Sequence, residues 1–139
     1  MGYKFLEHTA DLKIIVEENS LERAFKTSVM ALKEVIAENI RVRTTLKKTI
    51  SVEGEDLSDL LYKFIEEFLF LLDSEDFLVS KIEKLEIREN EKGYALTTNV
   101  SGDKSSRYNF SNSVKAITFN DMFVKEEKGK FRIQFVLDV

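Results

Sequence analysis

The sequence predicts an α+β fold: a single domain, residues 1–139, in which two amphipathic helices pack on one face of a mostly antiparallel sheet. Stretches where apolar and polar residues alternate, as they do in half-buried strands, lie near both ends of the chain. Two stretches whose apolar residues have helical spacing lie among them. They do not alternate regularly with the strands, as a parallel sheet would require. A chain of 139 residues is long enough to bury one core.

The first third of the chain contains two expected strands and the first expected helix. Alternation over 3–7 and 12–18 predicts the strands. A helix follows over 20–38, because apolar residues there return at the spacing of one helical face. Asn19 or Ser20 precedes it and is of a residue type that caps helices.

The rest of the chain is mostly β. A strand containing Leu46, Ile50 and Val52 precedes a second helix over 56–73, whose wide apolar stripe has to pack on a sheet. Two hairpins follow, each over a short turn that contains glycine and charged residues. Their strands are 82–88 with 94–100 over NEKG, and 117–124 with 131–137 over EEKGK.

Composition narrows the chemistry that this chain can perform. It has no cysteine and one histidine, which excludes disulfides, zinc–cysteine sites, thiol nucleophiles and imidazole-rich metal sites. A bound metal would therefore be held mostly by oxygen, which favours hard cations such as Ca²⁺ or Mg²⁺. The net charge of −4 argues against a domain whose main task is to grip phosphate backbones. Nucleotide-binding loops, nucleophile elbows and kinase motifs are absent from the sequence.

Membrane segments are not expected either. No apolar run reaches the ~20 residues of a bilayer span, because Lys63, Glu66 and Glu67 interrupt the most apolar stretch. The opening MGYKFLEH lacks the apolar centre of a signal peptide. We therefore expect a cytoplasmic protein that does not enter a membrane.

The two ends of the sequence hold the candidate metal ligands. The segment EHTADLKI (7–14) separates the first two strands and contains His8 and Asp11, while the sequence finishes as a strand with Asp138 before Val139 and its main-chain carboxylate. If Asp11 lay nearby, three carboxylates would repel one another unless a cation held them. Three alternatives stay open: a structural hydrogen bond for His8, an Asx turn for Asp11 and a solvated chain end.

Two further features have a functional and a structural interpretation. The only basic cluster consists of Arg41, Arg43, Lys47 and Lys48. It could touch RNA or an acidic partner, but a solvated loop is the favoured interpretation. The polar stretch GDKSSRYNFSN, with Arg107 and Tyr108, could be a recognition element, but a mobile surface loop is slightly favoured.

Five segments, in the same order along 3–139, resemble the archease family. They are YKFLEHTADLKI, SLERAFKTSVMAL, EDLSDLLYKFIEEFLFLLDSEDF, KAITFND and the terminal FVLDV. The resemblance implies a protein that is not an enzyme but a cofactor of the GTP-dependent RtcB-type RNA ligase, which joins tRNA exon halves. It also implies that the protein promotes guanylylation and turnover of the ligase, and that it meets tRNA only through the ligase.

The resemblance also implies a set of metal ligands. Carried over to this chain, the family's site falls on Asp11, Asp138 and the terminal carboxylate of Val139. The implied cofactor is a divalent cation, with Ca²⁺ favoured and Mg²⁺ or another hard cation as the alternative. The sequence departs from the family pattern at Asn120 and Tyr108, where the pattern has histidine.

The residues alone, considered without the archease resemblance, suggest a second possible function. It is a metal-dependent hydrolase in which His8 acts as the base beside a carboxylate-bound cation. The sequence offers this alternative no evident substrate-binding motif.

Overall fold

The computed structural model describes residues 2–7 and 11–139, of which 6 and 7 by backbone only. The helices and strands expected from the sequence are confirmed, and the α+β class with them. Neither helix in this part of the chain is long and apolar enough to cross a bilayer. In order, the elements are β1 (Gly2–Glu7), β2 (Asp11–Glu18), α1 (Leu21–Ile36), β3 (Leu46–Gly54), α2 (Leu57–Glu75), β4 (Phe77–Asn90), β5 (Gly93–Lys104), the 3₁₀ helix η1 (Ser105–Arg107), β6 (Ala116–Glu127) and β7 (Lys130–Asp138).

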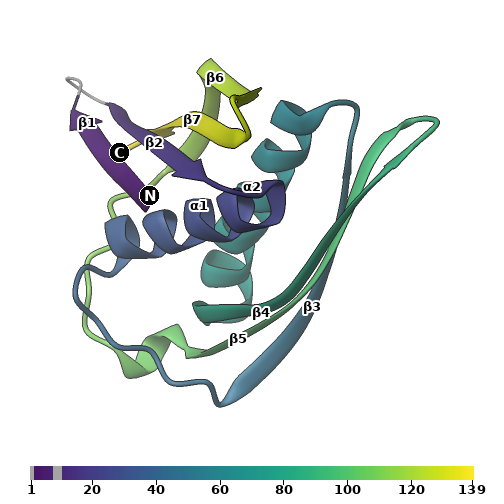
Figure 1. Ribbon diagram of the computed structural model, residues 1–139. Coiled ribbons are helices and arrows are strands. Elements are labelled where there is room, and N and C mark those ends of the chain that lie inside the picture. The colour runs from purple at the N-terminus through teal and green to yellow at the C-terminus, as the bar shows by residue number, and fades with distance from the viewer. Residues whose placement is uncertain (1, 8–10) are drawn as a thin grey trace.

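The strands form two antiparallel sheets, which differs from the single sheet expected. One sheet has the order β1-β2-β7-β6 and the other β3-β5-β4. The helices therefore do not share one face of one sheet. α1 contacts strands of both sheets and so does α2, and Figure 1 shows the helices between them. Alternation shows that each strand has a buried side, but it does not show which strands share that side.

Both α-helices begin after a residue whose side chain satisfies a free backbone N–H of the first turn. The Ser20 hydroxyl accepts a hydrogen bond from the Arg23 N–H at 3.2 Å, and the Asp56 carboxylate accepts one from the Asp59 N–H at 2.8 Å. Such caps are typically worth about 1 kcal/mol each. Ser20, rather than Asn19, is therefore the cap of the first helix.

The core lies between the two sheets and is built around the helices. Phe25 of α1 and Phe64 of α2 stack with ring centroids 6.1 Å apart. Ile14 and Phe135 contribute from the first sheet and Leu96 from the second, all essentially inaccessible to solvent. Because residues alternate along a strand, burial of one side of β2 and β7 leaves the other side on the outer face of the sheet.

Gly54, at the end of β3, permits close contact between this strand and α2. A Cβ atom on Gly54 would lie 2.4 Å from the Leu60 nitrogen and 2.7 Å from its Cα, both of them helix backbone. Gly54→Ala should therefore lower the free energy of unfolding by about 1–3 kcal/mol, as overpacking typically does. Urea unfolding measures this. Ser51→Ala, at an exposed position of the same strand, should change stability little. Equal stability of the two variants would contradict the contact.

Candidate functional site

The pairing of β2 with β7 places Asp11 directly opposite Asp138. The neighbouring pair, Leu12 with Leu137, points to the core, so the two aspartates lie on the outer face. Directly opposed residues of antiparallel strands have Cβ atoms about 4.5–5.5 Å apart. Two carboxylates from opposite ends of the chain are therefore neighbours, and both are half-buried.

Strands on both sides hold Asp138 in place. β7 lies between β2 and β6, and Asp138 is paired with Asp11 on one side and Ala116 on the other. The Lys115 N–H also donates to the Asp138 carbonyl at 2.7 Å. Val139 follows directly and packs against the core. The end of β7 is therefore part of the sheet and not a frayed tail.

The charges around the aspartate pair suit an oxygen-bound cation. Among the described residues, the ion pairs include neither Asp11 nor Asp138. Lys13, the next residue of β2 on this face, is paired with Asp121 instead, at 3.5 Å. Two adjacent carboxylates repel each other, and a hard cation would relieve this repulsion.

The pair alone does not make a full coordination shell. Among the side chains of residues 2–5 and 11–139, no group of three or more His, Cys, Asp or Glu is placed to hold a metal ion. A third ligand would have to come from elsewhere, such as the main-chain carboxylate expected at Val139. His8, the base of the hydrolase alternative, lies outside the described residues.

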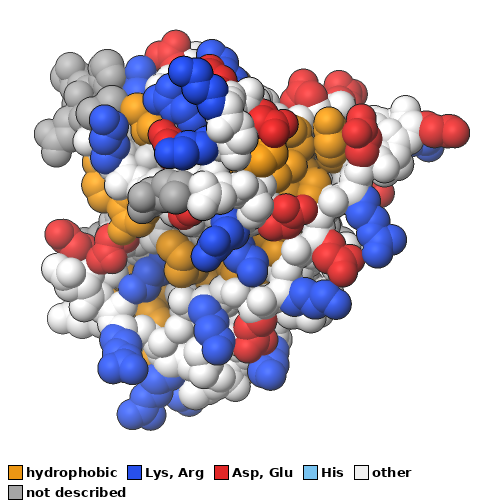
Figure 2. Space-filling model, viewed as in Figure 1, with side chains coloured by type: hydrophobic (Ala, Val, Ile, Leu, Met, Phe, Trp, Pro, Cys, Tyr) orange, Lys and Arg blue, Asp and Glu red, His pale blue; other side chains and the backbone are white. Residues whose placement is uncertain are grey.

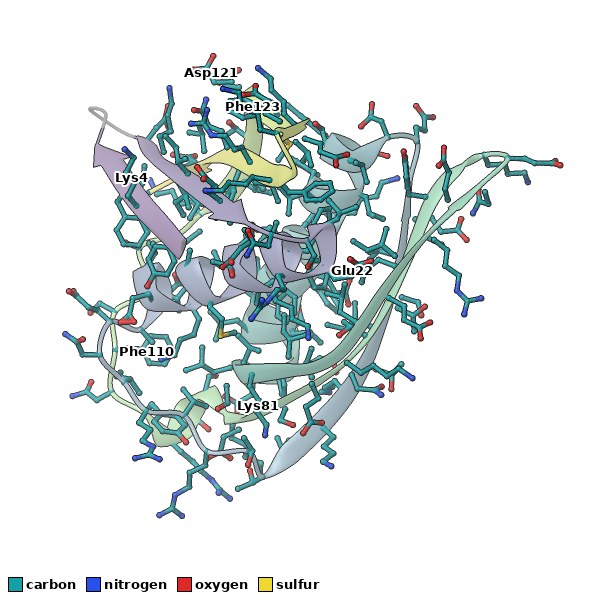
Figure 3. The ribbon with its side chains drawn as sticks, viewed as in Figure 1. Lys4, Glu22, Lys81, Phe110, Asp121 and Phe123 are labelled. Carbon is teal, nitrogen blue, oxygen red and sulfur yellow. The ribbon has the colours of Figure 1, made fainter. Side chains whose placement is uncertain are left out.

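A bulge in β6 reaches the same face. The pairing with β7 jumps from Thr118 to Phe123, so the four residues between them leave the regular ladder. Asp121 adopts a φ of 57° within the bulge, and its carbonyl accepts a hydrogen bond from Gln134 at 2.8 Å. Figure 3 shows the Asp121 side chain at the rim of the molecule, pointing away from the helices. Asn120 is exposed and lies in this bulge, on the strand that pairs with β7.

The first part of the stretch GDKSSRYNFSN is anchored by Asp103, while several of its later residues are exposed at the surface. Asp103 is 1% exposed and is the residue before the last of β5. Its carboxylate accepts hydrogen bonds from Thr45 at 2.5 Å and from the Tyr108 hydroxyl at 2.7 Å, and it pairs with Arg107 at 3.4 Å. The Tyr108 hydroxyl in turn accepts from the Arg43 N–H at 2.8 Å. Tyr108 therefore has a structural role in this chain.

The same contacts change the acidity of Asp103. Hydrogen bonds from Thr45 and Tyr108 to the charged form lower the pKa of the Asp103 carboxyl from 3.8 to about 2. The sequence contains no signal for this network, because polar residues around a buried carboxylate look the same as polar residues in a solvated loop.

Fold and site together define a small two-sheet α+β protein with a pair of aspartates on an outer face. Residues 3–139 match the Archease protein family (MTH1598/TM1083). The chain is 35% identical over 140 residues to protein archease of Aeropyrum pernix, covering 99% of this chain and 97% of that one. It is 36% identical to protein archease of Pyrococcus abyssi, covering 99% and 98%. The chain belongs to the archease family.

Solved structures have the same fold. The solution structure of Methanobacterium thermoautotrophicum protein 1598 superposes with a TM-score of 0.84 at 27% identity, covering 99% of both chains. The crystal structure of a Thermotoga maritima archease, described as a possible chaperone, gives a TM-score of 0.63 at 16% identity, covering 98% of this chain and 96% of that one.

Asp103 should contribute to acid stability. Because its pKa is lower in the folded than in the unfolded chain, its contribution is present above pH 3.8 and is lost as the pH falls toward about 2. Asp103→Asn should therefore be less stable than the wild type at pH 7, and the difference should shrink between pH 4 and pH 2. Urea unfolding across this range measures it. Asp73→Asn, at an exposed position, should follow the wild type. A constant difference for Asp103→Asn would contradict the lowered pKa.

Proposed function

We propose that this protein is a non-catalytic activator of an RtcB-type tRNA-splicing RNA ligase. It promotes guanylylation and turnover of the ligase during tRNA exon ligation in the cytoplasm. Membership of the archease family supports this proposal. The observation that carries it is the pairing of Asp11, the last residue of the HTAD segment, with Asp138 at the end of β7.

We also propose that this place holds a divalent cation. The ligands are the carboxylates of Asp11 and Asp138 and the main-chain carboxylate of Val139. Oxygen ligands favour Ca²⁺, and Mg²⁺ or another hard cation is the alternative. When bound, the cation would supply a positive charge between the two adjacent carboxylates. The protein's own contribution is to hold its ligands rigidly, since Asp138 is paired on both sides.

The hydrolase alternative lacks a supporting observation. It requires a general base beside the cation, and its candidate, His8, is not among the described residues. The activator proposal requires only that the aspartate pair be presented to another protein. Asp11 and Asp138 meet this requirement, because they lie on the outer face of the sheet and not in the core.

Stimulation of the ligase should depend on the aspartate pair. Asp11→Asn removes one charged ligand with almost no change of shape, so guanylylation should fall to the rate of the ligase alone. The measurement is transfer of labelled GMP to the cognate ligase with and without this protein. Glu127→Gln, an exposed change at the far end of the same sheet, should stimulate as the wild type does. Residues added after Val139 should weaken stimulation, because its carboxylate becomes a neutral amide. Full stimulation by both the Asp11→Asn and the extended protein would sink the proposal.

Cation binding should stabilise the wild type but not Asp138→Asn, so that the order of their melting temperatures reverses when the cation is added. Ca²⁺ at a hundredfold excess over its Kd should stabilise the wild type by about 2.7 kcal/mol. Asp138→Asn should lose this gain. Without the cation, however, the variant should melt slightly above the wild type, because the repulsion between the two carboxylates is gone. Differential scanning calorimetry in EDTA and in Ca²⁺ tests both parts of this prediction, and Mg²⁺ is measured for comparison. A wild type that Ca²⁺ and Mg²⁺ leave unshifted would exclude the site.

A further inference from the structure

A basic hollow lies beside the connection between α1 and β3, on a surface separate from the aspartate pair. Its volume is about 710 Å³. Three of its lining residues are cationic, three carry hydroxyls, two are apolar and none is acidic. They are Lys33, Ile40, Arg41, Val42, Arg43, Thr44, Thr45 and Ser80. The chain as a whole has a net charge of −4, so this positively charged lining differs in sign from the protein's total charge.

The connection directs its two arginines to the same side. Val42 is 6% exposed and belongs to the core, while Arg41 and Arg43 on either side of it are exposed. The Ser80 hydroxyl donates to the Val42 carbonyl at 2.6 Å, and the Lys33 ammonium donates to the Ile40 carbonyl. These bonds hold the backbone, so the arginines project from a fixed segment.

The Asp103 network holds the other end of the same segment. The Arg43 N–H donates to the Tyr108 hydroxyl, and Thr45 donates to Asp103 itself. Arg107 pairs with Asp103 and leaves 55% of its side chain exposed, so it adds a third guanidinium beside the segment. A buried carboxylate thus positions cations that come from two separate connections.

The cations gather at one end of the molecule. Figure 1 places the α1–β3 connection and the segment after β5 together at the lower end, away from the end of β7. Figure 2 shows Lys and Arg side chains along that lower end, with few acidic ones among them. A concentration of one charge sign on a face attracts and orients an oppositely charged ligand.

We propose that this basic hollow binds the phosphate backbone of a single-stranded nucleic acid. Guanidinium groups fit phosphate oxygens as a bidentate fork. Arg41 and Arg43 are two residues apart, about 7 Å in an extended chain. A nucleic acid offers phosphates at short, regular intervals, whereas an acidic peptide carries its carboxylates on flexible stems. A single strand can follow a hollow surface, which a stiff duplex cannot.

Binding is tested with a fluorescein-labelled single-stranded RNA oligonucleotide by fluorescence anisotropy. The Arg41→Ala/Arg43→Ala double variant should bind about tenfold or more weakly at low salt. The slope of log K against log salt should fall by about 1.4, which is about 0.7 for each lost phosphate contact. The control, Arg88→Ala/Lys92→Ala, removes the same charge from exposed positions of the β4–β5 hairpin and should bind nearly as the wild type does. Equal losses in the two double variants would overturn the site.

The Tyr108→Phe variant tests whether RNA binding depends on the fixed position of the arginines or only on their positive charge. It removes the hydroxyl that holds the Arg43 segment without changing any charge, so affinity should fall severalfold. Circular dichroism at the assay temperature confirms that the variant is folded. Wild-type affinity in Tyr108→Phe would show that charge alone binds the RNA and would overturn the site.

Competition identifies the ligand class. Unlabelled single-stranded DNA should displace the RNA, because the contacts are to phosphates, and polyglutamate should not. Displacement by polyglutamate as effective as by DNA would assign the hollow to an acidic protein and overturn the proposal. The assay contains EDTA and no ligase, so its outcome is independent of the proposed activator function, and Asp11→Asn should bind RNA normally.

Discussion

The antiparallel register of β2 against β7 is the contact on which both the core and the candidate site depend. Ile14 and Val16 of β2 are buried opposite Phe135 and Ile133 of β7. A slip of one residue would turn such side chains outward, at about 1.5–3 kcal/mol each, and would bring the facing charged residues inward. The same apolar burial that stabilises the sheet therefore also holds Asp11 opposite Asp138.

Two groups of aspartates in this protein differ in what surrounds them, and the difference separates their roles. Asp103 is buried and has hydrogen bonds from Thr45 and Tyr108, so its charge is satisfied within the protein. Asp11 and Asp138 stand side by side, and the nearby Lys13 is paired with Asp121. The first is a structural carboxylate that orders two connections. The pair of Asp11 and Asp138 is suited to bind a ligand from outside the protein.

The two positions that depart from the pattern of the archease resemblance also have different surroundings. Tyr108 fills a defined structural place, since its hydroxyl joins Asp103 to the backbone of Arg43. Asn120 is exposed on the β6 bulge, where its N–H donates to Thr118 and its side chain faces solvent. A bulge next to a site often serves to aim a side chain. Of the two substitutions, the one at Asn120 therefore lies on the strand that pairs with the end of β7.

The sequence by itself determined the helices, the strands and the sides on which they are buried, because hydrophobic periodicity is a local property. It also restricted any metal site to oxygen ligands, since the chain has no cysteine and one histidine. The resemblance, and not the spacing, named Asp11 and Asp138 together. Only the tertiary structure decided that the strands form two sheets, that Asp11 faces Asp138 and that Asp103 is buried among polar partners. These are contacts between residues far apart in the chain, and no local pattern encodes which strands pair or which polar side chains lose their water.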